Sequence, residues 1–300
     1  MSQLTGTIDD FGMSAASLAG SLETRLKAMR EGGLSQVMLD ARDVTDHPGG
    51  VEAAIAAVRA SGLRVAGLQL LTDFEGLDGR PHDYKVDVAK SMLELCAAVG
   101  ARLLLVASTT SPHASRDVDA MARDLRKLAM LAVPLGLRIA YGALSWGRAV
   151  ADFPAAWDVV ARADAPNLGL ALDAFHILAA GTPLDEIELL DAQRIFLVQL
   201  ADFMWSGMPS ADERRAAAQH LRVFPGEGVH TEALAELATR LDALGYRGDY
   251  VFDVSNDDYR RMPPAAVVQR ALRAAQWLGE DVLRRSAPLV GRMRLRRAAQ

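Results

Sequence analysis

Apolar and polar positions along the chain follow two patterns that alternate with each other. Short and almost entirely apolar runs, such as residues 102–107, are typical of strands buried on both faces of a parallel sheet. Longer segments, such as residues 117–135, repeat apolar residues every three or four positions, as amphipathic helices do. Gly136 follows that segment, and glycine readily adopts the left-handed conformation that ends a helix. The pattern therefore predicts successive strand–helix units.

This succession continues along nearly the whole chain, with about eight units if a short first strand lies at or just before residues 14–18. Parallel strands need crossover helices, and eight such units favour a closed (β/α)8 TIM barrel over an open doubly wound sheet. No Gly-x-Gly-x-x-Gly motif follows the first strand, which argues against a dinucleotide-binding fold, and no P-loop is present. The other predicted strands are 36–40, 64–70, 102–107, 137–141, 168–173, 194–200 and 250–254, and the predicted helices are 22–29, 51–60, 84–99, 117–135, 154–163, 231–244 and 264–278.

The domain organisation predicted from this pattern is a single TIM-barrel domain over residues 1–283. Residues 1–12 are expected to form an N-terminal extension, and residues 284–300 an arginine-rich C-terminal tail. Such a tail can bind anions, although a solvated chain end is the simpler interpretation. Residues 202–230 form the longest connection without a predicted element, and long connections of this kind often serve as binding segments or lids.

Composition narrows the class of protein. The chain has 300 residues, 50% of them hydrophobic, which is enough for a large core, and its net charge of −5 gives no general reason to expect a nucleic-acid partner. We find no signal peptide and no uncharged apolar run long enough to span a membrane. The lone cysteine, Cys96, excludes an internal disulfide and is expected in the core. We expect a cytoplasmic protein that binds a small-molecule substrate; a homo-oligomer is compatible with the sequence.

Polar residues interrupt three of the apolar strands near their carboxyl ends. They are Asp173, Gln199 and Asp253. In a TIM barrel the active site lies at this end of the strands. A buried carboxylate needs a compensating charge, and carboxylate and amide oxygens suit hard cations such as Mg²⁺ or Mn²⁺. The alternative is that each side chain bonds backbone groups or an arginine at the barrel rim.

Three further polar residues complete the candidate site. His176 follows Asp173 by three residues, and a histidine just past a strand end can move a proton near neutral pH. His220 and Arg222 precede Phe224-Pro225-Gly226, where the arginine can hold a carboxylate or phosphate by two contacts. The alternatives are a histidine that caps the next helix and an arginine that is an ordinary surface charge.

These residues belong to segments that resemble the sugar phosphate isomerase/epimerase superfamily, also called the xylose isomerase-like barrels. Within it, the chain resembles bacterial 3-dehydroshikimate dehydratases. The resemblance covers residues 13–280, and its segments are Leu68-Gln69, Asp73-Phe74-Glu75-Gly76, Ile139 to Arg148, Pro166 to Leu170, Asp173 to Leu178, Val198 to Asp202, Arg222 to Gly226 and Asn256-Asp257.

The resemblance implies a divalent metal, Mg²⁺, Mn²⁺ or Co²⁺, held by Glu, Asp, Gln and Glu at four strand ends. Three of these positions carry over as Asp173, Gln199 and Asp253, and the histidine proposed to move the proton carries over as His176. Arg222, Gln69, His220 and Thr72 are the candidate substrate-binding residues.

This chain departs from the family pattern at several of these positions. Gly142 stands where the family has a glutamate ligand, so one of four ligands is missing. Asp253 replaces the final glutamate, and Thr72 replaces an arginine that would contact an acidic substrate. Met38 to Asp43 lacks the family's usual glutamates, although Asp40 offers a carboxylate nearby. Because metal affinity depends on the number and charge of the ligands, we expect a weakened or absent metal.

Three hypotheses follow. The first is a lyase or isomerase that transfers a proton on a small polyhydroxylated or keto-acid metabolite different from the dehydratase substrate. The second is a genuine 3-dehydroshikimate dehydratase whose missing ligand comes from elsewhere. The third is a catalytically inactive relative that binds a metabolite or a partner protein.

Overall fold

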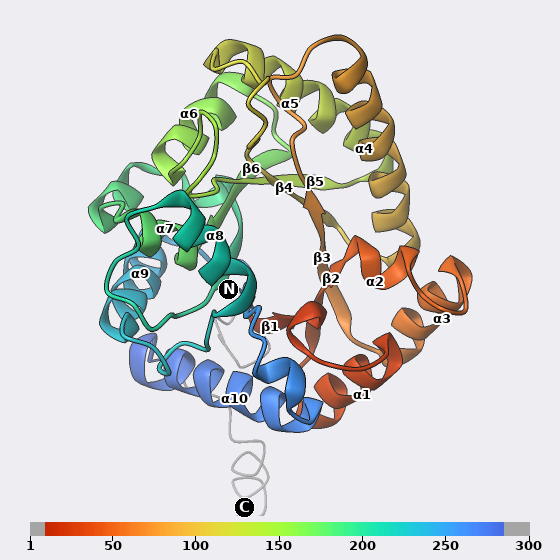
Figure 1. Cartoon of the computed structure of the whole chain (residues 1–300), viewed down its shortest axis with the longest axis vertical. Helices are drawn as coiled ribbons and strands as arrows, with labels where there is room; N and C mark the ends of the chain where they lie inside the picture. The colour runs from red at the N-terminus through yellow and green to blue at the C-terminus, as the bar shows by residue number, and fades with distance from the viewer. Residues whose placement is uncertain (1–9, 285–300) are drawn as a thin grey trace, which may run out of the picture.

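Eight parallel strands close into a barrel in the order β1 to β8, with the helices outside it (Figure 1). The structure is a computed structural model that describes residues 10–284. The predicted (β/α)8 TIM barrel is confirmed. The strands are β1 (Phe11–Ser14), β2 (Gln36–Asp40), β3 (Arg64–Leu71), β4 (Leu103–Ala107), β5 (Arg138–Gly142), β6 (Leu168–Asp173), β7 (Ile195–Leu200) and β8 (Tyr250–Phe252).

The helices agree with the amphipathic segments of the sequence, and most of the major ones end at a glycine with positive φ, as α1 does at Gly33 and α3 at Gly62. Three short helices, α2, α7 and α8, are not predicted by the sequence. The helices are α1 (Leu22–Gly32), α2 (Ala41–Thr45), α3 (Val51–Ser61), α4 (Gly79–Val99), α5 (Val118–Ala132), α6 (Phe153–Ala163), α7 (Ala174–Ala180), α8 (Ala211–His220), α9 (Thr231–Leu244) and α10 (Pro264–Gln276).

Two predicted boundaries need correction. The barrel begins at Phe11, so the expected extension of residues 1–12 overlaps β1; the strand is short and starts with a phenylalanine and a glycine, which give no recognisable run. The connection at 202–230 is not wholly irregular, because α8 lies within it. Of the arginine-rich tail, residues 285–300 lie outside the described residues. Among the described helices, none is both long and apolar enough to cross a membrane.

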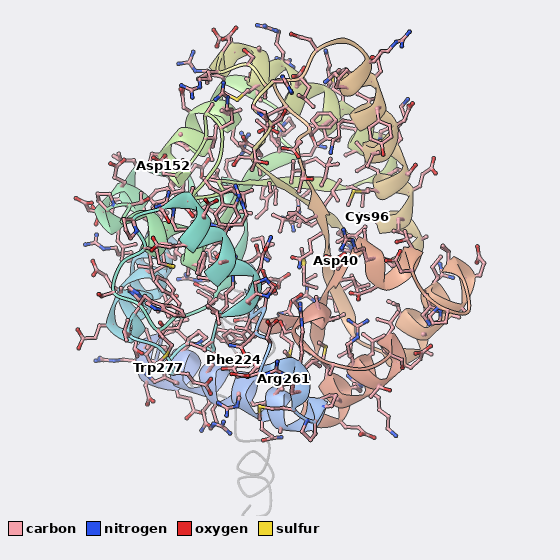
Figure 2. All side chains as sticks on the ribbon, viewed as in Figure 1. Asp40, Cys96, Asp152, Phe224, Arg261 and Trp277 are labelled. Atoms are coloured by element: carbon pink, nitrogen blue, oxygen red, sulfur yellow. The ribbon has the colours of Figure 1, made fainter. Side chains whose placement is uncertain are left out.

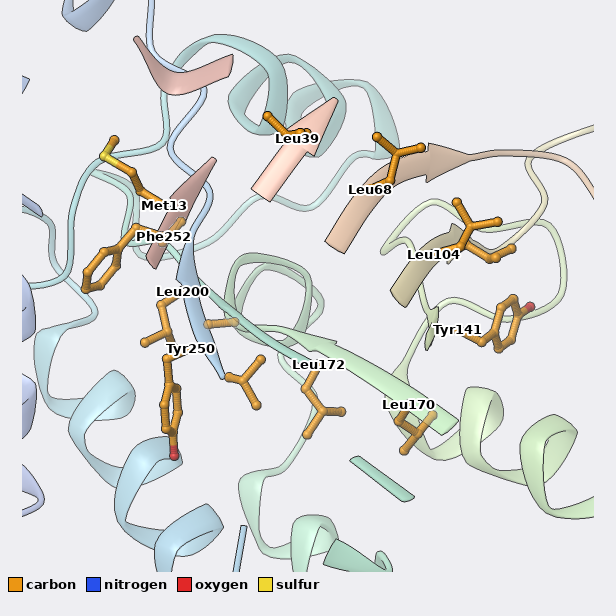
Figure 3. Packing of buried hydrophobic residues seen from close by; sticks show 14 of the residues in the cluster. Met13, Leu39, Leu68, Leu104, Tyr141, Leu170, Leu172, Leu200, Tyr250 and Phe252 are labelled. Atoms are coloured by element: carbon orange, nitrogen blue, oxygen red, sulfur yellow. The ribbon is translucent and has the colours of Figure 1, made fainter. Parts of the chain in front are cut away.

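The core has two layers that follow from the alternation of side chains along each strand. Leu39, Leu172 and Phe252 belong to the large layer between the strands and the helices, part of which Figure 3 shows. Their neighbours Ala171 and Val251 belong to a smaller layer inside the barrel. Because alternate residues share a face, the next position on each strand points back toward the barrel axis.

That alternation produces a ring of mostly polar side chains at the carboxyl ends of the strands. Opposite this polar arc, β4 and β5 contribute only Ala107 and Gly142, which are register partners. We call the six polar members of the ring the polar arc, and we call Ala107 and Gly142, whose side chains offer no polar atom, the donor-free wall. Its members in strand order are Ser14, Asp40, Gln69, Ala107, Gly142, Asp173, Gln199 and Asp253. Figure 2 shows Asp40 near the open centre of the barrel, whereas the buried Cys96 lies on the side of α4.

The connection after β7 is held at both ends by one buried carboxylate. Asp202 accepts hydrogen bonds from the backbone N–H groups of Phe203, Gly228 and His230 at 2.7 to 3.2 Å, and from the Thr231 hydroxyl at 3.3 Å. These contacts fix where the loop leaves the barrel and where it returns. They also place α8 beside the opening of the barrel (Figure 1).

Candidate active site

A cavity of about 790 Å³ opens at the carboxyl ends of the strands. It is lined by every residue that the sequence singles out for the site, from five strands and the connections that follow them. The structure therefore brings these residues together, while their individual roles remain predictions. They are Gln69, Thr72, Gly142, Asp173, His176, Gln199, His220, Arg222 and Asp253.

Arg222 is the charge at the centre of this group. Its side chain is only 5% exposed, and its Nη1 donates to Asp173 Oδ2 at 2.9 Å and to Asp253 Oδ2 at 3.4 Å. Its Nε donates to the carbonyl of Ala218 at 3.1 Å, and its guanidinium lies 4.5 Å from the centre of the Phe175 ring. The arginine is thus fixed by two carboxylates, a helix carbonyl and an aromatic face.

His176 lies beside this ion pair and is buried. Its Nε2 is 3.4 Å from Arg222 Nη2 and 3.6 Å from Asp173 Oδ2. Its Nδ1 is 3.2 Å from the Ser145 hydroxyl oxygen, and the edge-on ring of Trp146 packs 4.9 Å away. The backbone N–H of Ser145 also faces Nδ1, at 3.3 Å, and Arg222 can only donate toward Nε2, so donors face both ring nitrogens. In the tautomer in which Nδ1–H donates to the Ser145 hydroxyl, Nε2 carries the lone pair that can accept a proton.

Burial and Arg222 act against each other on the pKa values of Asp173 and Asp253, whereas both lower the pKa of His176. Burial alone raises the pKa of Asp173, but the charges of Arg222 and His176 outweigh it and hold this pKa below its usual range. Burial raises the pKa of Asp253 by more than Arg222 lowers it. Burial lowers the pKa of His176 to about 4, despite the opposing charge of Asp173. Near neutral pH, Asp173 is therefore ionised and His176 is neutral.

The amide side chains of the ring form a second network. Gln199 Nε2 donates to Gln69 Oε1 at 3.1 Å, and Gln69 Nε2 donates to the Ser14 hydroxyl at 3.3 Å. This chain of hydrogen bonds links β7, β3 and β1 across the barrel. It holds both amides in place at the base of the cavity.

Known proteins share this barrel, and one of them is identical at about a third of the aligned positions. The model of the xylose isomerase-like TIM barrel family matches residues 26–283. The chain belongs to that family. It is 34% identical over 281 residues to the 3-dehydroshikimate dehydratase of Pseudomonas aeruginosa, which covers 93% of this chain. The chain spans less than half the length of that relative, 43%.

Two solved structures show the same fold. A fusion protein of a xylose isomerase-like TIM barrel with a 4-hydroxyphenylpyruvate dioxygenase superposes with a TM-score of 0.84 and is 30% identical; the match covers 92% of this chain and 44% of that one. A structure of the IOLI protein with a bound zinc atom superposes with a TM-score of 0.78 at 18% identity, over 91% of this chain and 98% of that one.

The donor set in this family member does not fit the four-ligand metal centre that the resemblance predicts. Gly142 offers no side-chain donor, and Ala107 beside it offers none either. Asp173 already accepts from Arg222 through Oδ2 and from the backbone N–H of Phe175 through Oδ1. Within residues 10–284, no group of three or more His, Cys, Asp or Glu side chains is placed to hold a metal ion.

Two of the predicted substrate-binding residues lie at the outer part of the cavity. Thr72 has a short side chain, and its carbonyl accepts from Lys85 Nζ at 2.7 Å. His220 is half-exposed, with its Nδ1 3.2 Å from Asp257. The family pattern has an arginine at the position of Thr72, and neither Thr72 nor His220 supplies that positive charge.

Several lining residues were not singled out from the sequence. Trp146 packs on His176, and the guanidinium of Arg215 lies 5.8 Å from the Trp146 ring centre. Arg42 and Arg260 also line the cavity and are exposed. These residues come from the connection after β5 (Trp146), from the helices α2 (Arg42) and α8 (Arg215), and from the 3-10 turn Tyr259–Arg261 (Arg260), where no strand pattern points to them. For Arg215 the available signal is the capping box of α8, because it shows that residues 211–220 are helical.

A second buried carboxyl lies behind β5. Glu75 is fully buried, and its Oε1 accepts from the backbone N–H of Thr109 at 2.6 Å and from the Tyr141 hydroxyl at 2.9 Å. Its Oε2 is buried without a hydrogen-bond partner. Burial raises the pKa of Glu75 to about 7, although the hydrogen bonds oppose this shift.

The raised pKa predicts a pH-dependent stability that Glu75→Gln removes. A pKa of about 7 in the folded state, against 4.5 for an exposed glutamate, means that the folded protein binds more protons between these values. The unfolding free energy should then fall by about 3 kcal/mol as pH rises from 4.5 to 7, and Glu75→Gln should lack this fall. Urea unfolding of both proteins at pH 5 and pH 8 measures it. Equal pH dependence in the two proteins would contradict the assignment.

Proposed function

We propose that the protein is a lyase or isomerase that transfers a proton on a small polyhydroxylated or keto-acid metabolite. The observation that supports this most strongly is the position of His176. It is a buried histidine, neutral near pH 7, whose Nε2 lies on the cavity beside both Asp173 and Arg222. A general base needs this protonation state and an adjacent group that stabilises the proton it receives.

The surrounding side chains suit that chemistry. When His176 accepts a proton at Nε2, the carboxylate of Asp173, 3.6 Å away, stabilises the imidazolium. Ser145 and Trp146 hold the ring from its other side, so the base keeps one orientation. The Gln69 and Gln199 amides at the base of the cavity are placed to bind hydroxyl groups of the substrate.

The substrate is proposed to differ from 3-dehydroshikimate because its acidic group cannot be held in the same way. Thr72 replaces the arginine of the family, and Arg222 is already paired with Asp173 and Asp253. The exposed arginines on the cavity, Arg42, Arg215 and Arg260, are the remaining cations available to an acidic group.

Proton transfer can be tested without knowing the substrate. The purified protein is incubated in D2O with candidate cyclic polyols and keto acids, and exchange of carbon-bound hydrogen is followed by NMR. We expect exchange at a carbon next to a carbonyl for one of the candidates. Absence of exchange and of turnover across the panel, with a metabolite nevertheless bound, would favour the inactive relative instead.

A second candidate function is 3-dehydroshikimate dehydratase activity itself. The 34% identity to the Pseudomonas aeruginosa enzyme over 93% of this chain favours it. The absorbance of protocatechuate, followed with and without Mg²⁺, Mn²⁺ or Co²⁺, tests this directly. Robust turnover that is lost in His176→Ala would establish the dehydratase and overturn the proposal of an altered substrate.

The arginine rim gives a prediction for substrate affinity. Arg215→Gln should raise KM for an acidic substrate about five- to tenfold and leave kcat nearly unchanged, because an exposed charge contributes about 1 kcal/mol to binding. Steady-state kinetics measures both constants. Arg162→Gln, which removes an exposed arginine outside the cavity, is the matched control. An equal loss of kcat in Arg215→Gln would contradict a role limited to substrate binding.

A further inference from the structure

We propose that this site works without a metal ion, because Gly142 removes one of the expected ligands and the guanidinium of Arg222 serves as the counter-ion of the two carboxylates that remain. The inference starts from the position of the charge. Arg222 Nη1 lies 2.9 Å from Asp173 Oδ2 and 3.4 Å from Asp253 Oδ2, and it also donates to the carbonyl of Asp253 at 3.4 Å. The two carboxylates expected to bind the metal therefore share one resident cation.

A metal ion bound to the same oxygens would meet this cation at close range. Divalent metals bind carboxylate oxygens at about 2.0–2.6 Å. The Nη1 donor already occupies that side of Asp173 Oδ2, and a double positive charge a few ångströms from a guanidinium is strongly repelled at a site with little water. Arg222 cannot swing away freely, because Ala218 and Phe175 hold its Nε and its flat face.

The charge of the remaining ring suits one guanidinium better than a divalent metal. With Gly142 in place of a glutamate, the site has lost one negative charge, and a single guanidinium balances a larger share of the remainder. A guanidinium carries one positive charge where a divalent ion carries two, so it suits a ring that has one carboxylate fewer. Of the ligand positions that the resemblance implies, a divalent ion would keep two carboxylates and one amide, Asp173, Asp253 and Gln199, with nothing from β4 or β5.

The arginine also lies where a carbonyl oxygen must be held during proton transfer, a point that rests on the proposed function. Arg222 Nη2 is 3.4 Å from His176 Nε2, so a base and a hydrogen-bond donor lie side by side. The C–H bond next to a carbonyl breaks, its proton goes to His176 Nε2, and the electron pair moves onto the carbonyl oxygen. Nη2–H then donates to that oxygen and stabilises its negative charge.

Metal binding tests the inference separately from turnover. The wild-type chain is dialysed against Mn²⁺ and against Zn²⁺, and the bound metal is measured by elemental analysis and calorimetry. We expect no stoichiometric metal and no rise of the unfolding midpoint with either ion. One equivalent of tightly bound metal that raises the midpoint would overturn the inference, and it would leave the proposed proton transfer standing. Missing turnover in a metal-free protein would instead contradict the proposed function.

Two variants separate the roles of Gly142 and Arg222. A Cβ at position 142 meets its nearest neighbours at 3.4 Å, so a longer side chain can enter the cavity with little adjustment. Gly142→Glu alone should still bind no metal, because Arg222 remains between the carboxylates. Adding Arg222→Gln should create a site that binds about one equivalent of Mn²⁺ and raises the unfolding midpoint. Stoichiometric binding by Gly142→Glu alone would show that Arg222 does not exclude the metal, and this variant keeps Arg222 even if the double variant fails to fold.

Discussion

His176→Gln should lower kcat by a factor of roughly 10² to 10⁴ and change KM little. Glutamine keeps a polar side chain of similar length near Ser145, so the fold and the cavity should persist. It cannot accept a proton near neutral pH, so the step assigned to Nε2 is lost. The rate of hydrogen exchange in D2O, measured by NMR, reports that step directly.

The matched control is His113→Gln. His113 is an exposed histidine in the connection after β4 that does not itself line the cavity, and its replacement should leave kcat within experimental error. Equal exchange rates in the wild type and His176→Gln would show that a residue other than His176 is the base. Asp40, whose carboxyl lies on the cavity and whose pKa is raised mainly by burial, would then be the next residue to replace.

Arg222→Met should lower the unfolding free energy by about 3–5 kcal/mol, because it leaves Asp173 and Asp253 buried without their shared cation. Methionine keeps most of the volume against Phe175, so the loss reports charge more than packing. Urea unfolding at pH 7 measures the change. Adding Asp253→Asn to Arg222→Met should recover part of the loss, since one uncompensated charge is removed.

The control for this prediction is Arg162→Gln. Arg162 forms ion pairs with Asp119 and Asp158 at the surface, and such pairs contribute at most about 1 kcal/mol. A similar loss in both arginine variants, or no recovery in the double variant, would show that Arg222 is not the buried counter-ion described above.

The barrel could be predicted from the sequence because its strands are buried on both sides. Residues such as 103–107 read as apolar runs, and the amphipathic helices between them have a clear period. The helix α8 could not be predicted in this way, because only Ala217 and Ala218 of its residues are buried and no apolar stripe marks it. Its capping box at Ser210 and Glu213 is a local signal that hydrophobic periodicity does not detect.

The candidate site likewise contains residues that the sequence pattern identifies and residues that it does not. Asp173, Gln199 and Asp253 stand out in the sequence because a polar residue in an apolar strand is unusual, and all three line the cavity. Trp146 and Arg215 do not stand out, since side chains from connections reach the cavity through geometry that spacing does not encode. The pairing of Arg222 with two of the strand-end carboxylates likewise depends on a contact between distant parts of the chain.

The donor-free wall formed by Ala107 and Gly142 has a consequence for stereochemistry. A cyclic polyol bound in this cavity meets amides and carboxylates on one edge and small side chains on the other. An isomer that turns a hydroxyl toward β4 and β5 gives up a hydrogen bond to water and receives none from the ring, which costs about 1–3 kcal/mol. For the proposed polyol substrate we therefore expect the barrel to distinguish epimers by leaving a hydroxyl unsatisfied, with no bulky side chain needed to exclude the wrong epimer.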